Sequence, residues 1–335
     1  MVETDILIIG AGPVGLFTVF EAGLLKLRCH LIDALPQPGG QLSEIYPKKP
    51  IYDIPGYPSV LAGELVDNLM EQIKPFHPGF TLGDRAETIE KQADGRFKVT
   101  SSRGVVHLAP VVAIAGGLGS FEPRKPPIHN LADFEDNGVE YIIRDPELYR
   151  NKRVVIAGGG DSALDWTIYL ADLASEISLV HRRTEFRGAL DSVEKVENLA
   201  AANKIKLIRE AQIVGLEGNG KLESVTIEQA DGEIKIPTDH YIPLFGLSPK
   251  LGPIGEWGLE IDKNAIVVNT LDYSTNIPGI YAIGDVNTYP GKLKLILCGF
   301  HEATLMCQSA YKFVYPEKKL SFKYTTVTGV SGFEG

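Results

Sequence analysis

Cysteine is scarce in this sequence of 335 residues, which has only Cys29, Cys298 and Cys307. No two of them form a C-x-x-C pair. This spacing excludes a disulfide framework and a zinc site built on cysteine pairs, and we expect no metal site. The plain interpretation is three free thiols, mostly buried.

A surplus of basic charge is also missing, since 33 lysines and arginines stand against 43 acids and give a net charge of −10. Contacts to nucleic-acid phosphates need a basic surface, so the balance argues against nucleic acid as the main partner. A negative net charge still allows local basic patches, although each pair of lysines or arginines can equally be solvated surface. The candidates are Lys48-Lys49, Arg124-Lys125, Lys292/Lys294 and Lys318-Lys319/Lys323.

Long apolar runs are absent as well. The longest, such as Val111–Ala115, are far shorter than the roughly 20 residues that cross a bilayer, so we expect no membrane span. The first strand-like run begins at residue 5, so we expect no secretory signal. The expected compartment is therefore the cytoplasm. Apolar content of 44% and this length are typical of a globular chain of two or three domains.

The first informative motif is a glycine turn at residues 10–15. An apolar run at 5–9 precedes it, a helical pattern covers 14–25, and a second strand is expected at 28–33, which makes a βαβ unit. Gly10, Gly12, Pro13 and Gly15 would bring backbone N–H groups to a pyrophosphate at a helix N-terminus. Asp33, eighteen residues after Gly15, would accept hydrogen bonds from a ribose hydroxyl. The turn predicts an FAD or NAD site; the alternatives are a tight turn without ligand and a surface acid.

A second glycine turn follows the strand expected at 152–157. Its residues Gly158, Gly160, Asp161, Ser162 and Ala163 open a helix expected at 161–173, and a strand at 177–181 comes next. Instead of an acid, His181, Arg182 and Arg183 occupy the position eighteen residues after the turn. Arginine pairs well with a 2′-phosphate, so this turn predicts an NADP site. A solvated basic face is the alternative. Proteins that bind two dinucleotides usually pass hydride between them.

The other patterns place the second unit inside the first. We predict an α/β fold of two nested Rossmann-like dinucleotide-binding domains, each of the three-layer ββα type. One is a discontinuous domain of residues 1–118 and 246–335, and the other is an inserted domain of residues 119–245. Gly116–Gly119 and Gly246–Pro249 are the expected hinges. The stretch 35–58, rich in Pro, Gly and Tyr, is long for a connection and is expected to be functional. Further helices are expected at 63–76, 193–203 and 299–311, and strands at 86–91, 97–101, 105–108, 110–115, 205–209, 213–217, 222–229 and 240–244.

Five motifs together resemble the thioredoxin-reductase-like ferredoxin–NADP reductases, within the two-dinucleotide flavoprotein disulfide-reductase superfamily, over the whole chain. They are Gly-Pro-Val-Gly-Leu-Phe at 12–17, Leu-Pro-Gln-Pro-Gly-Gly-Gln-Leu-Ser at 35–43, Gly-Gly-Gly-Asp-Ser-Ala-Leu-Asp-Trp at 158–166, His-Arg-Arg-Thr-Glu-Phe-Arg at 181–187 and Ala-Ile-Gly-Asp-Val at 282–286. The resemblance implies that the first turn binds FAD and the second NADPH or NADP+, with Arg187 joining the arginines on the 2′-phosphate.

Further FAD contacts come from the same resemblance. Gln41 falls in the flavin-side loop, Tyr46 falls where the family stacks a tyrosine on the flavin ring, and Asp285 falls where it binds the ribityl chain. Tyr52 is a second candidate for stacking, and both tyrosines can equally be loop aromatics. Three further positions match the family's FAD contacts less distinctively, because an ordinary core residue or a residue of a frayed tail would fit them equally well. Ala86 and Phe121 match positions around the adenine and the flavin, and Thr326 matches a hydroxyl in the tail.

The last segment, at 318–335, suggests a homodimer, because in such reductases a partner's tail covers the second flavin face. Tyr324 matches that role, with Phe333 as the fallback. One departure separates the chain from thioredoxin reductases, whose Cys-x-x-Cys lies shortly before the second turn. Residues 139–149 hold no cysteine, so a dithiol cannot carry the electrons onward there.

The resemblance therefore implies hydride transfer from NADPH to FAD and single-electron transfer to ferredoxin or flavodoxin. Catalysis would rest on placement by Tyr46 and Tyr324, with no acid–base residue. Two alternatives remain open: an NADPH-dependent diaphorase or reductase for another small acceptor, and a flavin-binding redox sensor without turnover.

Overall fold

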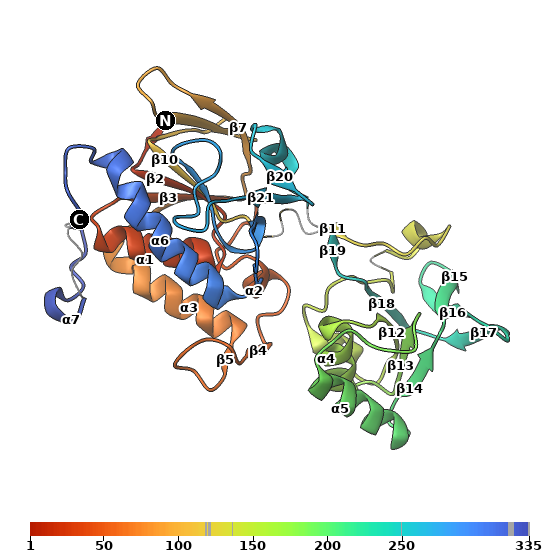
Figure 1. The fold of residues 1–335 in the computed structure, drawn as a ribbon. Helices are drawn as coiled ribbons and strands as arrows, with labels where there is room; N and C mark the ends of the chain where they lie inside the picture. The colour runs from red at the N-terminus through yellow and green to blue at the C-terminus, as the bar shows by residue number, and fades with distance from the viewer. Residues whose placement is uncertain (118, 120–121, 136, 249, 321–324, 334–335) are drawn as a thin grey trace. The chain divides into compact units, whose positions relative to one another are not determined.

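Two segments from opposite ends of the chain build the larger of two units in the computed structural model (Figure 1). Unit 1 comprises Met1–Ser120 and Pro249–Gly335, and unit 2 is Phe121–Ser248. These boundaries lie two and three residues from those expected from the glycine-containing hinges. The structure describes residues 1–117, 119, 122–135, 137–248, 250–320 and 325–333.

A five-stranded parallel sheet forms the centre of unit 1, in the order β22-β10-β2-β3-β6. Both faces of the sheet are covered, and β2 and β10 are therefore apolar and buried along their whole length. The strands are β2 (Ile6–Ile9), β3 (Cys29–Asp33), β6 (Gly79–Leu82), β10 (Val111–Ile114) and β22 (Ile280–Ala282).

Three helices lie together on one side of this sheet, and α1 contacts both of the others (Figure 1). They are α1 (Pro13–Leu24), α3 (Ala62–Ile73) and α6 (Ile296–Val314). α3 buries Leu65, Leu69 and Ile73, the stripe at intervals of four that predicted the helix. The packing of α1 on α6 is close, because a Cβ atom on Gly299 would stand 2.4 Å from a methyl carbon of Val14.

A sheet of four strands in the order β1-β9-β8-β7 covers the other side. Its strands are β1 (Val2–Glu3), β7 (Ala86–Lys91), β8 (Phe97–Ser101) and β9 (Val106–Ala109). The short elements of unit 1 are α2 (Gln41–Glu44), β4 (Pro50–Ile51), β5 (Val60–Leu61), β20 (Ile261–Asp262), β21 (Ala265–Val267), β23 (Asn287–Thr288), α7 (Thr325–Thr328) and the 3-10 turns η1 (Lys74–Phe76), η4 (Gly252–Glu256) and η5 (Gly284–Val286).

Unit 2 repeats the three-layer plan at smaller size. Its parallel sheet has the order β14-β13-β12-β18, with two helices on one side and a three-stranded antiparallel sheet on the other (Figure 1). The elements are β12 (Arg153–Gly158), α4 (Asp161–Leu170), β13 (Glu176–His181), α5 (Leu190–Ala201), β14 (Lys206–Arg209), β15 (Gln212–Gly218), β16 (Leu222–Gln229), β17 (Gly232–Pro237) and β18 (His240–Leu244), with β11 (Glu122–Pro123), η2 (Leu131–Asp133), η3 (Pro146–Tyr149) and β19 (Leu247–Ser248) beside them.

The parallel topology places the predicted motifs at the carboxyl ends of their strands. In unit 1 the first glycine turn follows β2, Asp33 ends β3, and η5 follows β22. In unit 2 the second turn follows β12 and His181 ends β13. Ligands of parallel α/β sheets bind beyond the carboxyl ends of the strands, so each unit gathers its candidate residues where a ligand would bind.

Candidate dinucleotide sites

The three glycines of the first turn serve two different purposes. Gly10 has φ +109°, and a Cβ atom on it would lie 2.4 Å from the Ala115 carbonyl oxygen. A Cβ atom on Gly15 would lie 2.0 Å from the Gly10 carbonyl oxygen, so the fold itself requires both glycines. Gly12 differs, because its φ of −71° suits any residue and a Cβ atom there would meet nothing within 4 Å. The space beside Gly12 is left open by the protein.

That open space lies at the N-terminus of α1. Gly12 is the N-cap residue, no side chain caps the helix, and Pro13 stands in its first turn. The first N–H groups of a helix have no partner inside the helix, and the helix dipole gives this end a partial positive charge. The arrangement fits a phosphate group that approaches the backbone at Gly12.

Asp33 is held beside this turn by two backbone groups. The Ala11 N–H donates to one carboxylate oxygen at 2.6 Å, and the Leu35 N–H donates to the other at 2.9 Å. Burial raises the pKa of Asp33, and these two hydrogen bonds oppose the rise. Each oxygen of a carboxylate can accept more than one hydrogen bond, so Asp33 retains capacity for ribose hydroxyls.

The segment at 39–46 meets this turn from another side. A Cβ atom on Gly40, the N-cap residue of α2, would lie 3.2 Å from the Gly12 Cα atom, so α2 begins against the open space. The Tyr46 hydroxyl donates to the Gln41 Oε1 atom at 3.5 Å. Burial raises the pKa of Tyr46, and the negative charge of Asp285 adds to the rise. Gln41, Tyr46 and Asp285 therefore belong to one neighbourhood in unit 1.

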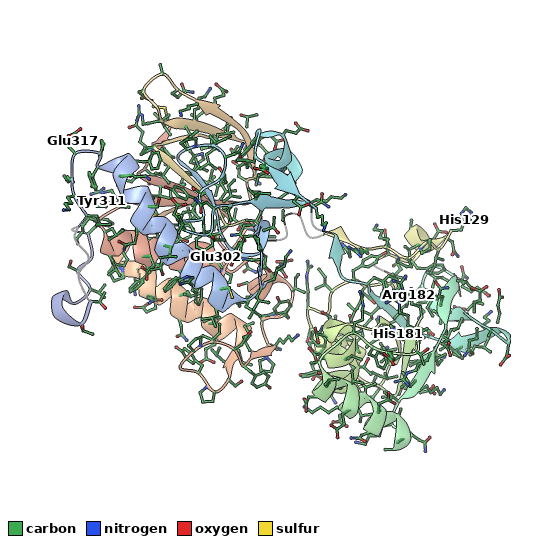
Figure 2. All side chains as sticks on the ribbon, in the orientation of Figure 1. His129, His181, Arg182, Glu302, Tyr311 and Glu317 are labelled. Carbon is green, nitrogen blue, oxygen red and sulfur yellow. The ribbon has the colours of Figure 1, made fainter. Side chains whose placement is uncertain are left out.

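One buried acid in this neighbourhood was not predicted. Glu302 on α6 is fully buried and accepts a hydrogen bond from the backbone N–H of Gly284 (labelled in Figure 2). It also pairs with Lys292, whose side chain is only 6% exposed. The expectation that Lys292 is a surface lysine is wrong, because its pairing with Glu302 draws it inside. An acid within the apolar stripe of the helix was the one sequence signal for this pair.

In unit 2 the second turn repeats the open glycine. Gly160 is the N-cap residue of α4, has φ −102°, and a Cβ atom on it would meet nothing within 4 Å. Gly158 is required by packing, since its Cβ atom would lie 2.7 Å from both Ala163 Cβ and the Leu244 carbonyl oxygen. The turn therefore has the same combination as the first, an uncapped helix N-terminus with free space at its N-cap.

The residues at and after the end of β13 divide into a buried histidine, His181, and exposed arginines; His181 and Arg182 are labelled in Figure 2. His181 is buried, bonds the Glu185 carbonyl oxygen through Nε2 at 3.0 Å, and stacks on Phe186. A Cβ atom on Gly159 would lie 2.1 Å from its ring, so the imidazole fills the space above that glycine. Arg182 and Arg183 are exposed. His181 thus shapes the loop that presents the arginines.

Backbone and side-chain contacts attach this arginine loop to the glycine turn. The Arg187 N–H donates to the Gly159 carbonyl oxygen at 2.8 Å, and the Asp161 carboxylate accepts from the Ala189 N–H at 2.8 Å. Asp161 is therefore directed to the loop. Because an acid facing a pyrophosphate would repel it, this orientation makes Asp161 compatible with the site. The loop geometry brings Arg187, which is exposed, to the turn.

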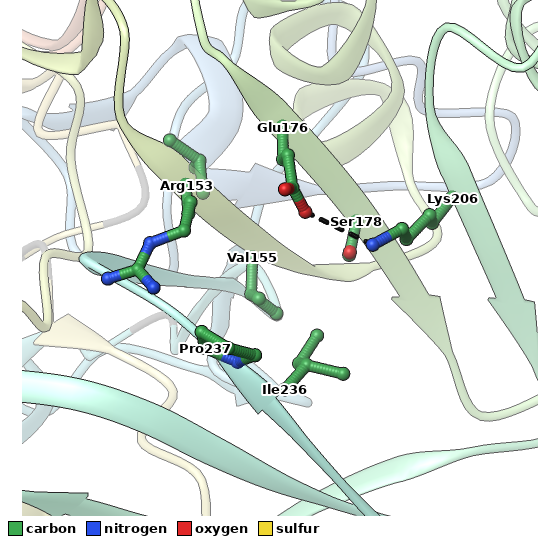
Figure 3. A pocket seen from close by; sticks show the side chains of 8 residues that line it. Arg153, Val155, Glu176, Ser178, Lys206, Ile236 and Pro237 are labelled. Carbon is green, nitrogen blue, oxygen red and sulfur yellow. Dashed lines mark hydrogen bonds and ion pairs between the residues drawn. The ribbon is translucent and has the colours of Figure 1, made fainter.

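A small cavity of about 40 Å³ lies elsewhere in unit 2 (Figure 3). Arg153, Glu176 and Lys206, at the amino ends of β12, β13 and β14, line it, and Lys206 pairs with Glu176 at 3.1 Å. The glycine turn is at the carboxyl ends of the same sheet, so the cavity is distinct from the candidate site. It is large enough for a water molecule and too small for a nucleotide.

A family model for pyridine nucleotide-disulphide oxidoreductases matches residues 4–303, a span that includes both glycine turns. The chain belongs to this family. Among its curated relatives is "Ferredoxin--NADP reductase 1" of Christiangramia forsetii, 74% identical over all of this chain and 96% of the relative. The "Ferredoxin--NADP reductase" of Flavobacterium johnsoniae is 71% identical over the same shares. One from Bradyrhizobium sp. (strain ORS 278) is 53% identical over 97% of this chain and 95% of the relative.

Solved structures confirm the fold predicted for this pyridine nucleotide-disulphide oxidoreductase. Lactococcus lactis thioredoxin reductase matches with a TM-score of 0.80 and 23% identity, covering 93% of this chain and 99% of that chain. Thioredoxin reductase of T. acidophilum matches with a TM-score of 0.80 and 22% identity over the same shares. The thioredoxin-reductase-like plan of two nested Rossmann-type domains is thereby confirmed.

The remaining predicted residues of this pyridine nucleotide-disulphide oxidoreductase have mixed positions. Ala86 is the buried first residue of β7, and Tyr52 is 70% exposed. Thr326 is exposed in α7, while Phe333 packs on Phe76 at the end of α3 and its η1 extension. Phe121 and Tyr324 lie outside the described residues. Within the described part of the chain, no helix is long and apolar enough to cross a membrane.

Proposed function

We propose that this protein is an FAD-dependent ferredoxin–NADP reductase. The observation that carries the proposal is the contrast between its two glycine turns, which share an open N-cap glycine and differ in the residues that would meet the ribose. The first is followed by a half-buried acid and the second by exposed arginines. Relatives named ferredoxin–NADP reductase, 53–74% identical over nearly the whole chain, support the same function.

FAD is assigned to unit 1 and NADPH to unit 2. Gly10, Gly12, Pro13 and Gly15 would hold the FAD pyrophosphate, and Asp33 the adenosine ribose. Gln41, Tyr46 and Asp285 would line the flavin part, with Ala86, Phe121 and Thr326 as the weaker assignments. Gly158, Gly160, Ser162 and Ala163 would hold the NADPH pyrophosphate. Arg182, Arg183 and Arg187 would pair with the 2′-phosphate, as guanidinium groups do with phosphates. His181 and Asp161, which the hydrogen bonds to Glu185 and Ala189 direct toward the loop, would support these contacts from behind.

The chemistry of the bound cofactors sets what the protein must supply. A flavin accepts hydride from a reduced nicotinamide and releases electrons one at a time, which is the conversion that a one-electron carrier requires. The protein's share is placement: the turns bind the phosphates, and Tyr46 excludes water from one side of the ring. Tyr324 of a second copy would cover the other side, which makes the enzyme a homodimer, whereas the fallback Phe333 is occupied by its packing on Phe76 of its own chain.

Onward transfer proceeds without a sulfur relay. Cys29 and Cys307 are buried, with pKa values raised chiefly by burial, and Cys298 lies in the first turn of α6. All three are free, and none has a neighbour in a C-x-x-C pair. A dithiol pathway needs one sulfur to attack and another to resolve. The electrons therefore pass to an external carrier, ferredoxin or flavodoxin, in the cytoplasm.

Docking of a small acidic carrier requires basic groups around the flavin unit. Lys48 and Lys294 are exposed in unit 1, whereas Lys292 is withdrawn by its pairing with Glu302. We assign the docking role to the exposed groups. Complementary charges mainly raise the rate of association, so the reaction with ferredoxin will slow as salt screens them.

The experiment that tests the function compares three acceptors. Purified protein reconstituted with FAD is given NADPH and then ferredoxin, a quinone or a dithiol substrate. A reductase of this kind turns over with ferredoxin faster than with the others. Faster turnover with the quinone or the dithiol would contradict the assignment. Reduction of the flavin by one equivalent of NADPH, with no transfer of electrons to any acceptor, would contradict it as well.

A further inference from the structure

An ion pair lies in the interior of unit 1, directly behind the turn that carries Asp285. The Glu302 carboxylate is fully buried, and the Lys292 ammonium group that contacts its Oε1 atom belongs to a side chain only 6% exposed. The Lys292 Nζ atom also lies 5.2 Å from the centre of the Tyr289 ring. Charges as deeply buried as these are uncommon in protein interiors and call for a specific reason.

Four groups converge on the Glu302 carboxylate. Oε2 accepts from the Gly284 N–H at 2.6 Å and from the Asn287 side-chain amide at 2.8 Å. Oε1 accepts from the Tyr289 hydroxyl at 2.8 Å and from Lys292. The same Asn287 amide donates to the Ala282 carbonyl oxygen at 2.9 Å, at the end of β22. Glu302 thus ties the segment from 284 to 292 to α6, and Asn287 ties it to the strand before it.

Stability is a weak explanation for this arrangement. The cost of removing two charges from water is large, and replacement of a buried ion pair by apolar residues of similar size is often neutral or stabilising. The shape of the turn is a better one. Gly284 has φ +76°, a left-handed conformation, and its N–H is directed at the Glu302 carboxylate. A glycine adopts this conformation without strain, but it also has access to many others, so the hydrogen bond from its N–H to Glu302 holds the turn in one of them.

The charges of Lys292 and Glu302 also act on Asp285, the residue assigned to the flavin site. Burial raises the pKa of Asp285, and the positive charges of Lys292 and Lys294 oppose that rise. Without Lys292, Glu302 would place an uncompensated negative charge behind Asp285. With it, the pair is neutral, and the charges left beside the turn are those of Asp285 and Lys294.

We infer that Glu302 is a positioning residue for FAD: its buried carboxylate holds the Gly284–Asp285 turn in the shape that receives the flavin side of the cofactor. Lys292 keeps that carboxylate compensated. The inference rests on the proposed function, since it assumes that FAD binds at this turn. It assigns the two residues no contact with the cofactor.

The test measures FAD dissociation constants of the full-length apoprotein, well below its melting temperature, by quenching of FAD fluorescence. Melting of the apoprotein is recorded separately. The main variant, Glu302→Leu with Lys292→Met, removes both charges and the acceptor for Gly284. A second variant, Glu302→Gln with Lys292→Met, removes both charges and keeps an acceptor. Lys292→Met alone leaves the carboxylate uncompensated, and Lys312→Met removes an exposed charge at the far end of the same helix.

The Leu/Met variant is expected to fold with a lower melting temperature, because three donors lose their acceptor in the interior, and to bind FAD at least about tenfold more weakly, the value of one hydrogen bond to a charged group. The Gln/Met variant is expected to return within about threefold of wild-type affinity. Lys292→Met alone should bind FAD weakly, and the addition of Glu302→Gln should restore it. Lys312→Met should bind as the wild type does.

Two results would overturn the inference while leaving the proposed function intact. One is wild-type FAD affinity in a folded Leu/Met variant. The other is a Gln/Met variant that binds no better than Lys292→Met alone, which decides the matter even if the Leu/Met variant does not fold. A wild-type protein that takes up no FAD would instead remove the proposed function and this inference together.

Discussion

Substitution of alanine for an open N-cap glycine is expected to stabilise the apoprotein and to weaken cofactor binding. At Gly12 an alanine finds no heavy atom within 4 Å of its Cβ atom, and φ −71° suits it. Gly12→Ala therefore leaves the folded apoprotein unstrained. It also restricts the unfolded chain, which stabilises a protein by about 0.4–1 kcal/mol at a compatible position. For a domain of roughly 150–250 residues this corresponds to a rise in melting temperature of about 1–4 °C.

FAD binding is expected to change in the other direction. The methyl group would stand in the space that the pyrophosphate needs to reach the N-terminus of α1. The loss of one charge-assisted hydrogen bond there costs about 1.5–3 kcal/mol. This corresponds to an FAD dissociation constant raised roughly 10- to 150-fold.

Gly160→Ala is the matched control, because Gly160 has the same open surroundings at the N-cap of α4 in unit 2. It should retain FAD fully and raise the KM for NADPH, while Gly12→Ala should lose FAD. FAD retention, NADPH titration and melting of the two apoproteins are measured side by side. The reasoning is refuted if Gly12→Ala binds FAD as tightly as the wild type, or if each variant weakens both cofactors equally.

Three other predictions concern the arginine loop, pH and salt. Arg182→Ala with Arg183→Ala should cost about 2–4 kcal/mol of NADPH binding, with NADH binding unaffected; unchanged NADPH kinetics in that double variant removes the assignment. Burial, with the nearby His107, lowers the pKa of His30 to about 4, so the folded state resists protonation. Stability should be constant above pH 6.5 and fall as pH drops from there toward 4, because the unfolded chain then binds more protons. At pH 5.5 the loss against pH 7 from His30 should be about 1 kcal/mol after allowance for its half-buried ring, seen in urea unfolding. The pKa of the buried His107 is lowered as well, so His30→Gln should reduce this loss without abolishing it; a flat wild-type profile, or one that His30→Gln leaves unchanged, contradicts the prediction. Ferredoxin reduction should slow several-fold between low and physiological salt, whereas reduction of a small neutral acceptor should not change.

Elements with strong local patterns could be predicted from the sequence. The two βαβ units could be predicted because short apolar runs, glycine turns and helical periodicity coincide within each. The strands β7, β8 and β9 could be predicted because turn residues separate them. The bounds of α6 were too short at both ends, since Gly299–Tyr311 omits three residues on each side of Ile296–Val314. β6 and β17 were missed. β6 is a half-buried edge strand of four residues, and β17 is almost wholly exposed, so neither has an apolar run.

At the site, residues whose role follows from backbone geometry were predictable, and residues whose role depends on a distant partner were not. Gly12 and Asp33 belong to a local motif. Lys292 was expected at the surface because lysines usually lie there, and only its pairing with Glu302 on a separate helix buries it. His181 follows the same rule, since its position depends on an absent side chain at Gly159, 22 residues earlier.

The central claim is that FAD and NADPH act together in this protein without sulfur chemistry, and one anaerobic rapid-mixing experiment tests it most directly. FAD-loaded protein, with its accessible thiols blocked by alkylation, is mixed first with NADPH and then with ferredoxin, while the visible absorbance of the flavin is followed. The account predicts that the yellow colour bleaches with NADPH and returns with ferredoxin at the rate of the untreated protein. A protein that cannot be loaded with FAD, or one whose alkylation abolishes the return of colour, would contradict it.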